Sequence, residues 1–320
     1  MKIVFGHHLS LRFLGGGEKW IISVANELVK RGHDVEIYST PIKTAGGIPI
    51  DNLDELLNGI PYKEKYRHSI NGDVCYVTYH PLYGLNFNTK GKLIVGIHAT
   101  TCWEPIDWGY GFLPIQAKIL HSIFGKSELK KADAIHTVAG YLDILHDKVY
   151  RIPNFVDENV YIPYKKVDKF TVGYISRKTN QKGWDIFKEI AIELVEKDID
   201  MRISGDISEE NLPKFISECH VIVVPSRHDS FGLVIVEALD GNVFVITSNI
   251  PSHKYLGLPL YYANSVTEYV NKIMWVRDLW KNYPKQFELM SRGLRDSAMK
   301  YSKWNIMNQL ENMFIEVGST

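Results

Sequence analysis

Two carboxylates lie eight positions apart where a predicted strand passes through a loop into a predicted helix. Residues 220–224 (HVIVV) are typical of a buried strand, and Pro225 marks its end. A helix that begins near Ser230 directs its unsatisfied N–H groups and the positive end of its dipole toward the preceding loop, where phosphate oxygens bind. At the helical rise, Asp229 and Glu237 are roughly 12 Å apart, comparable to the distance from a hexose across a diphosphate to a ribose. The spacing therefore predicts a nucleotide-sugar site, with Asp229 on the sugar and Glu237 on the ribose.

The same segment resembles the signature of a known family. A proline-serine pair, an acid, Phe231-Gly232 and a second acid after seven intervening residues resemble the motif of retaining glycosyltransferases with the GT-B fold, glycosyltransferase family 4. The resemblance implies that N–H groups of Ser230, Phe231 and Gly232 bind the donor phosphate. The family usually has glutamate at both acidic positions, and the shorter Asp229 shifts the sugar contact or makes it water-mediated. In the competing interpretation, Asp229 caps the helix and Glu237 is a solvated helix residue.

A basic loop follows the first predicted strand of the second half, in residues 176–185 (SRKTNQKGWD). It resembles the family's motif of arginine, a four-residue gap and lysine-glycine, which implies that Arg177 and Lys182 neutralise the donor diphosphate. Cleavage of the sugar–phosphate bond leaves negative charge on the β-phosphate, and two fixed cations stabilise that charge without a metal ion. A solvated basic turn is the alternative.

Three consecutive glycines, residues 15–17, lie between the first predicted strand and the first predicted helix. Glycines there let the backbone approach a ligand closely and adopt positive φ. Together with the downstream RGHDV of residues 31–35, the segment resembles the family's first βα unit, which implies that Gly16 or Gly17 contacts the donor. A flexible turn is the alternative. A metal site at His7 and His8 is disfavoured, because neighbouring strand residues point to opposite faces.

A histidine, His98, follows the predicted strand of residues 93–96. The family commonly has a histidine here, which implies a place near the donor sugar and the acceptor hydroxyl. A structural hydrogen-bonding role is the alternative, and Asp107 is a weaker candidate on the acceptor side. The candidate catalytic residues are Arg177, Lys182, Asp229 and His98, and the candidate donor-binding residues are Gly16, Gly17, Ser230, Phe231, Gly232 and Glu237.

Short apolar strands alternate with amphipathic helices along the chain, which predicts an α/β protein with parallel, doubly wound sheets. Two such series predict two Rossmann-like domains that face each other across a cleft, as in the GT-B fold. We expect an acceptor-side domain over residues 1–160 and a nucleotide-sugar-binding domain over residues 161–300. By the resemblance, a C-terminal helix in residues 301–320 packs back on the first domain, and we expect Trp304 to make that contact.

The charge balance of the 320 residues, 37 Lys and Arg against 37 Asp and Glu, indicates no nucleic-acid partner. The three scattered cysteines argue against a disulfide framework and a zinc site. The chain begins as a strand without the apolar core of a signal peptide, and no apolar run is long enough to cross a bilayer, so we expect a cytoplasmic protein. Residues 117–131 combine apolar residues with four lysines. A solvated basic helix is favoured there over a segment on an anionic bilayer, which leaves peripheral membrane contact as the second interpretation.

The motifs and the resemblance together predict a retaining glycosyltransferase that moves a sugar from a nucleoside diphosphate sugar, of UDP or GDP type, to an acceptor hydroxyl without a metal ion or cofactor. On that model the leaving phosphate itself assists deprotonation of the acceptor on the same face. The acceptor is a carbohydrate, a glycolipid or a small molecule. Two other functions stay open, a nucleotide-sugar 2-epimerase and a non-catalytic nucleotide-sugar-binding protein. A dehydrogenase is disfavoured because the complete G-x-G-x-x-G fingerprint is absent.

Two departures from the family pattern affect the second domain. The chain is short between Gly205 and Leu212, where family members carry a further αβ segment that helps to contact the nucleobase, so base recognition has no assigned residues. Residues 250–255 (IPSHKY) replace the customary glycine-rich loop. We expect His253 and Lys254 of this segment to lie on the solvated surface rather than beside the donor.

Overall fold

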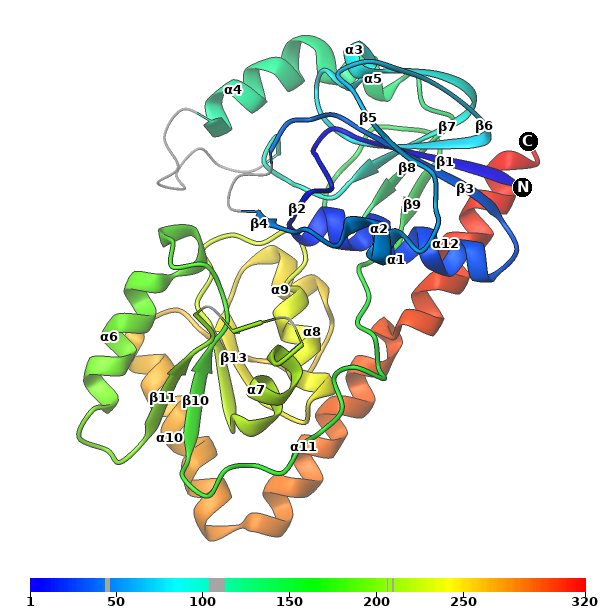
Figure 1. Cartoon of the computed structure of the whole chain (residues 1–320). Helices are drawn as coiled ribbons and strands as arrows, with labels where there is room; N and C mark the ends of the chain where they lie inside the picture. Colours follow the sequence, from blue (N-terminus) through cyan, green and yellow to red (C-terminus); the bar gives the residue numbers. More distant parts are fainter. Residues whose placement is uncertain (44–46, 104–112, 206, 209) are drawn as a thin grey trace. The chain divides into compact units, whose positions relative to one another are not determined.

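The computed structural model describes residues 1–43, 47–103, 113–205, 207–208 and 210–320. These residues form two compact units, each built on its own parallel sheet (Figure 1). The N-terminal unit holds the described residues up to 153 together with residues 307–320, and the C-terminal unit holds residues 154–306. In the described residues, the chain passes from the first unit to the second after residue 153 and returns to the first at residue 307.

The N-terminal unit has a seven-stranded sheet in the order β5-β3-β1-β6-β7-β8-β9, with every neighbouring pair parallel. The strands are β1 (Lys2–His7), β3 (Asp34–Ser39), β5 (Tyr62–Glu64), β6 (His68–Thr78), β7 (Phe87–Ile97), β8 (Ala134–Thr137) and β9 (Val149–Arg151). Two short strands, β2 (Phe13–Leu14) and β4 (Ile48–Pro49), pair antiparallel beside it. Strand order reverses between β1 and β6, because β3 and β5 extend the sheet to one side and β7 to β9 to the other.

The helices of this unit include α1 (Gly16–Lys30), α2 (Leu53–Leu57), α3 (Tyr83–Asn86), α4 (Leu113–Leu120), a π-helical turn (His121–Gly125) and α5 (Lys126–Leu129). α1 buries one apolar face that includes Trp20, Val24 and Leu28. The end of α4 and the π-helical turn after it are different, since Ile119, Ile123 and Phe124 keep 53%, 62% and 45% of their surface exposed. No helix of the described residues is long and apolar enough to span a bilayer.

The last helix, α12 (Lys303–Gly318), contributes its final turns to the N-terminal unit. Its buried side chains there recur at helical spacing, namely Met307, Leu310, Met313, Phe314 and Val317. Phe314 lies edge-on to Phe5 with ring centroids 6.0 Å apart. The expectation for Trp304 was wrong: the indole is 65% exposed, and Trp304 lies before Met307, in the part of α12 that belongs to the C-terminal unit.

The C-terminal unit has a five-stranded parallel sheet in the order β11-β10-β12-β13-β14. Its strands are β10 (Thr171–Tyr174), β11 (Asp200–Ile203), β12 (Val221–Val224), β13 (Phe244–Ser248) and β14 (Tyr261–Ala263). Its helices are α6 (Trp184–Leu194), α7 (Leu212–Glu218), α8 (Leu233–Asp240), α9 (Pro251–Tyr255), α10 (Val266–Asn282) and α11 (Pro284–Ala298), with 3₁₀ turns at Asn180–Lys182 and Met299–Tyr301. α7, α8 and α11 pack together, and α6 packs with α10.

The prediction of parallel α/β sheets is confirmed, and the strands predicted at residues 93–96 and 220–224 are observed within β7 (Phe87–Ile97) and as β12 (Val221–Val224). β7 is longer than predicted, and β6 and β7 have 11 residues each, because they pair with each other along both their first and their last halves. β5, β9 and β14 were not predicted. Each has three residues, too few to give a periodic pattern, and each lies at a sheet edge where pairing with one neighbour defines it.

A buried tyrosine organises the centre of the N-terminal unit. Tyr76 on β6 is fully buried, and its hydroxyl lies 2.6 Å from Nδ1 of His136 and 2.8 Å from Nε2 of His98. His136 Nε2 donates to the Ile152 carbonyl, so the neutral ring accepts the Tyr76 proton at Nδ1. Gly96 on the neighbouring strand β7 leaves the space for this hydroxyl, since a Cβ there would overlap it.

We expect Gly96→Ala to destabilise the protein by about 1–3 kcal/mol, because the fixed Tyr76 ring cannot move away from the added methyl group. Gly293→Ala is the matched control, since Gly293 lies in α11 with no atom near its added Cβ. The control should stabilise by up to about 1 kcal/mol through helix propensity. Urea denaturation of both variants tests this, and equal effects of the two substitutions would contradict the assignment of Gly96.

Candidate functional site

In the C-terminal unit, two loops follow the strands at which sheet order reverses. β10 leads to β11 on one side and β12 leads to β13 and β14 on the other, so the loops after β10 and β12 lie next to each other at the carboxyl edge. Ligands of open α/β sheets bind at such a reversal, because the helices that follow the two strands lie on opposite faces. The predicted basic loop follows β10 and the predicted acidic loop follows β12.

The structure pairs the acidic residue of one loop with the lysine of the other. Nζ of Lys182 lies 2.8 Å from Oδ2 of Asp229, and each side chain is 18% exposed. Burial by itself would raise the pKa of Asp229, but the Lys182 charge, assisted by His253, outweighs it and holds the pKa far below its usual range. Asp229 is therefore an ionised carboxylate at every physiological pH, and it is paired with the Lys182 ammonium group.

A second ion pair fastens the two loops together. The Arg227 guanidinium donates two parallel hydrogen bonds to the Asp185 carboxylate, at 2.7 and 2.6 Å, and a third to the Asn180 carbonyl at 2.7 Å. The Arg227 backbone N–H also donates to the Gln181 carbonyl at 2.8 Å. The sequence analysis did not identify this pair, since no spacing rule relates residues 42 positions apart.

Gly183 allows the loops to approach. Its φ is +68°, a conformation that L side chains rarely adopt, and a Cβ would overlap the carbonyl oxygen of Pro225. The lysine-glycine pair of the motif thus has a structural reason: the glycine brings the loop against the end of β12, and Lys182 then reaches Asp229.

Arg177 lies exposed at the start of the same loop. Its carbonyl oxygen accepts from the Tyr174 hydroxyl at 2.9 Å and from the Thr179 N–H at 2.8 Å. The backbone that carries Arg177 is therefore fixed, while its side chain is accessible to solvent.

Helix α8 begins at Leu233, three residues later than predicted, and Gly232 precedes it with φ +89°. Glu237 lies within this helix, is 8% exposed, and accepts from the Tyr161 hydroxyl at 2.9 Å. It is thus a buried, hydrogen-bonded carboxylate and not a solvated helix residue. No sequence motif identified Tyr161 as a partner of Glu237. The Phe231 side chain packs in the core against Tyr301, which leaves only its backbone for a ligand.

His253 differs from its prediction. We expected a solvated position, but α9 buries the ring fully, with Nδ1 at 2.6 Å from Oγ1 of Thr247 and Nε2 at 3.9 Å from Oδ2 of Asp229. The short helix α9 (Pro251–Tyr255) directs this residue inward. Lys254 is exposed, as predicted. The Asp229 carboxylate is therefore flanked by Lys182 and His253.

Gly15, Gly16 and Gly17 do not adopt positive φ, contrary to expectation. Gly16 and Gly17 form the first turn of α1. An added Cβ on Gly16 would meet no atom within 4 Å, and one on Gly17 would approach only Cε1 of His7, at 3.8 Å. Packing within the protein therefore gives no reason for glycine here, and the space above the turn is open.

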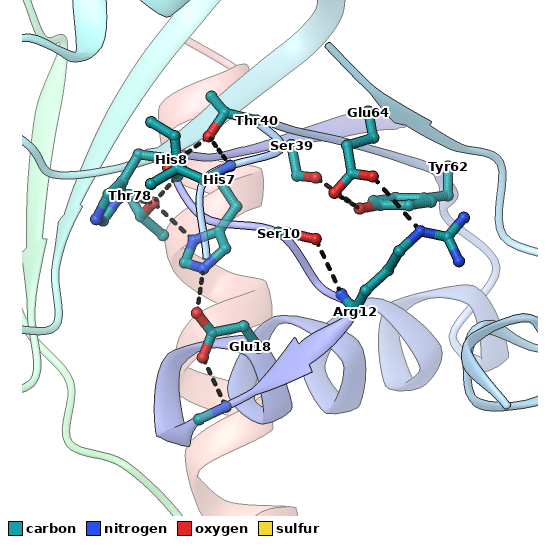
Figure 2. Close-up of polar contacts among 12 residues, drawn as sticks. His7, His8, Ser10, Arg12, Glu18, Ser39, Thr40, Tyr62, Glu64 and Thr78 are labelled. Carbon is teal, nitrogen blue, oxygen red and sulfur yellow. Dashed lines mark hydrogen bonds and ion pairs between the residues drawn. The ribbon is translucent and has the colours of Figure 1, made fainter. Parts of the chain in front are cut away.

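His7 and His8 do not point to opposite faces, because β1 ends at His7 and His8 belongs to the following loop. Both rings contact the Thr78 hydroxyl, His7 through Nδ1 at 2.8 Å and His8 through Nδ1 at 3.1 Å (Figure 2). Nε2 of His7 lies 3.0 Å from Oε1 of Glu18. Among the described residues, no group of three or more His, Cys, Asp or Glu side chains is arranged to hold a metal ion.

His98 follows β7 and is fixed by the core of the unit. Nε2 lies 2.8 Å from the Tyr76 hydroxyl, and the ring packs against Trp20 with centroids 4.4 Å apart. Burial, assisted by neighbouring histidines, holds the pKa of His98 well below its usual range. His98 is therefore a neutral, oriented imidazole. Asp107 lies outside the described residues.

Comparison with known proteins agrees with this geometry. Residues 187–257 match the family model described as Glycosyl transferases group 1. No curated protein sequence matches the chain. Solved structures do match over the whole length, and they define the class: two Rossmann-like units with the fold of GT-B glycosyltransferases.

Three of these structures illustrate the likeness. Sucrose-phosphate synthase from Thermosynechococcus elongatus is 15% identical, with a TM-score of 0.72 and complete coverage of both chains. HepE from Anabaena, solved with UDP and glucose, is 13% identical with a TM-score of 0.68 over 99% of each chain. The catalytic domain of starch synthase IV from Arabidopsis thaliana, bound to ADP and acarbose, is 13% identical with a TM-score of 0.62 over both whole chains.

We expect Arg227→Ala to loosen the loop that holds Lys182. The Arg227–Asp185 pair is partly exposed, so it contributes at most about 1 kcal/mol, or roughly fivefold in local opening. Hydrogen exchange at the bonded amides of Lys182, Gly183 and Trp184 should quicken by that factor, with little change in global stability.

Arg202→Ala is the control for that experiment, since Arg202 forms comparable ion pairs with Asp200 and Glu218 elsewhere in the unit. Its exchange effect should be confined to its own surroundings. Unchanged exchange at residues 182–184 in Arg227→Ala would mean that the ion pair does not hold the loop.

Proposed function

We propose that the protein is a retaining glycosyltransferase that transfers a sugar from a nucleoside diphosphate sugar to an acceptor hydroxyl. One observation carries the proposal: at the strand-order reversal of the C-terminal unit, Lys182 and Asp229 meet at 2.8 Å in loops whose sequences resemble the donor-binding motifs of glycosyltransferase family 4. The match of residues 187–257 to a glycosyltransferase family model supports it.

The donor diphosphate binds beside Lys182 and Arg177. On donor arrival, the Lys182 ammonium shares its hydrogen bonds between Asp229 and a phosphate oxygen, and the accessible Arg177 side chain adds a second cation. Backbone N–H groups of Ser230, Phe231 and Gly232 complete the phosphate contacts. These groups are held in place before the reaction, so they stabilise the charge that develops on the leaving phosphate without reorganisation.

The two carboxylates hold the neutral ends of the donor. Asp229 accepts from hydroxyls of the transferred sugar, and Glu237, oriented by Tyr161, accepts from the ribose. The donor is of UDP or GDP type. HepE was solved with UDP and starch synthase IV with ADP, so related folds accommodate more than one base.

The sugar is transferred with retention and without a metal ion. As the bond from the anomeric carbon to the phosphate oxygen breaks, that oxygen takes the proton of the acceptor hydroxyl, and the acceptor oxygen bonds to the anomeric carbon on the same face. His98, neutral and fixed by Tyr76, is the side chain of the N-terminal unit proposed to contact the acceptor hydroxyl. Carbohydrates, glycolipids and hydroxyl-bearing small molecules all fit as acceptors.

Calorimetric titration with UDP-, GDP- and ADP-sugars, followed by assays of sugar release, tests this function. We expect one nucleotide class to bind and Glu237→Gln to weaken that binding roughly ten- to hundredfold, since a charge-assisted hydrogen bond contributes about 1.5–3 kcal/mol. Arg177→Ala should mainly lower turnover. Glu193→Gln on the exposed face of α6 is the control and should change neither quantity.

The other outcomes of these assays would favour a different function. Donor binding without transfer or hydrolysis would favour a non-catalytic nucleotide-sugar-binding protein. Conversion of the sugar at C2 would favour an epimerase. Absence of binding to every nucleotide sugar would overturn the proposed function.

We also propose peripheral contact between the N-terminal unit and an anionic bilayer, with the protein otherwise cytoplasmic. The exposed side chains of Ile119, Ile123 and Phe124 support this, because they project from a segment that also carries Lys126. Apolar side chains at the acyl boundary and lysines at the headgroups are typical of interfacial helices.

We expect Ile123→Glu to reduce binding to phosphatidylglycerol vesicles on the order of tenfold, through lost apolar burial and added repulsion. Leu145→Glu is the matched control, since Leu145 is 91% exposed outside this segment. Sedimentation with anionic and with neutral vesicles measures both variants. Equal binding of the two vesicle types, or equal loss in both variants, would argue against a specific membrane face.

A further inference from the structure

The strand-order reversal of the N-terminal unit carries a group of neutral histidines that the donor site does not use. β1 ends at His7 and β6 ends at Thr78, and these are the two strands between which the order reverses. His8 follows the first and His80 the second. A ligand site is expected at this edge for the same reason as in the C-terminal unit.

Hydrogen bonds fix the protonated nitrogen of His8. The Glu18 carboxylate can only accept, so a His7 ring with a single proton donates it to Glu18 through Nε2 and accepts the Thr78 proton at Nδ1. The Thr78 oxygen is left to accept from Nδ1–H of His8 at 3.1 Å (Figure 2). Neutral His8 therefore carries its proton on Nδ1 and a lone pair on Nε2.

The frame that holds this chain of hydrogen bonds is rigid. Glu18 is 2% exposed and accepts from the Gly15 N–H at 2.9 Å through its second oxygen, which anchors it to the first turn of α1. The Thr40 hydroxyl donates to the His8 carbonyl at 2.6 Å. Among the described residues, no hydrogen bond reaches Nε2 of His8, whose side chain is partly exposed.

His80 has the opposite arrangement of donor and acceptor. Its Nδ1 accepts from the Leu82 N–H at 3.2 Å, so the neutral ring carries its proton on Nε2. The rings of His8 and His80 are stacked, with centroids 5.2 Å apart and 30° between their planes. The pair thus offers one acceptor, on His8, and one donor, on His80.

Both imidazoles are uncharged at physiological pH. Burial lowers the pKa of His8 well below its usual range, with further lowering by His7 and His80, and burial also lowers the pKa of His80. The open space above Gly16 and Gly17 lies at the same edge, since Gly17 is next to the His7 ring.

We propose that the His8–His80 pair binds an uncharged polyhydroxylated molecule, a sugar or polyol, through a hydroxyl that donates to Nε2 of His8 and accepts from Nε2–H of His80. An alcohol is both donor and acceptor and matches the pair. A carboxylate or phosphodiester has no proton for His8, and an ammonium group finds one acceptor only. In the proposed glycosyltransferase this molecule is the acceptor, and that part rests on the proposed function.

The protonated nitrogens can be observed directly. Long-range ¹H–¹⁵N spectra of the histidine-labelled full chain should show His8 protonated at Nδ1 and His80 at Nε2. Thr78→Val removes the hydroxyl at nearly constant shape and should move the His8 proton toward Nε2, whereas Thr137→Val, a buried control outside the cluster, should not. His8 protonated at Nε2 in the unaltered protein would overturn the inference.

Binding is tested on the same nitrogens with glucose, mannose, glycerol, glucuronate and glucosamine. We expect the neutral compounds to shift the signals of both rings and glucuronate to bind no more tightly than glucose. His8→Phe and His80→Phe should each weaken the effect by about tenfold. No response to any neutral compound would overturn the proposal.

The experiments distinguish failure of the proposed glycosyltransferase function from failure of the proposed polyol site. If nucleotide sugars do not bind the C-terminal unit but glucose still shifts His8 and His80, the glycosyltransferase function falls and the polyol site stands. If the donor binds and His8→Phe leaves the affinity for every neutral compound unchanged, the polyol site falls.

Discussion

The reversal of strand order within each parallel sheet is the constraint on which the rest of the structure depends. All strands of a parallel sheet end at the same edge, and at the reversal two successive loops lie beside each other without a helix covering them. In the N-terminal unit these are the loops after β1 and β6, and in the C-terminal unit the loops after β10 and β12. Most candidate functional side chains lie in these four loops, while the sheets and helices serve to hold them.

The two edges differ in their electrostatics, and the difference follows from what surrounds each. In the C-terminal unit, ion pairs stabilise the charged side chains: Asp229 pairs with Lys182, and Asp185 pairs with Arg227. In the N-terminal unit, burial keeps His8 and His98 uncharged. An edge with fixed charges suits a diphosphate, and an edge with oriented neutral groups suits hydroxyls. This division matches the two substrates of the proposed reaction.

Local patterns predicted the parts of the site that lie in one segment. The acidic loop and the basic loop each follow a strand as predicted, because glycine, proline and apolar periodicity act over a few residues. Predictions about the direction in which a side chain points were less successful. Trp304 faces solvent, His253 faces the core, and the rings of His7 and His8 converge on Thr78. The direction of a side chain depends on the residue at which its strand or helix ends, and moving that end by one residue changes the direction.

The sequence alone therefore determined the fold class, the alternation of strands and helices, and the residue types available at each loop, since these follow from local preferences and short spacings. Only the tertiary structure decided which side chains meet. Lys182 reaches Asp229 across 47 positions, Tyr161 reaches Glu237 across 76, and His7 reaches Thr78 across 71. Such pairs are set by the order of strands in the sheet and by close backbone approach, as at Gly183, and no local pattern records either.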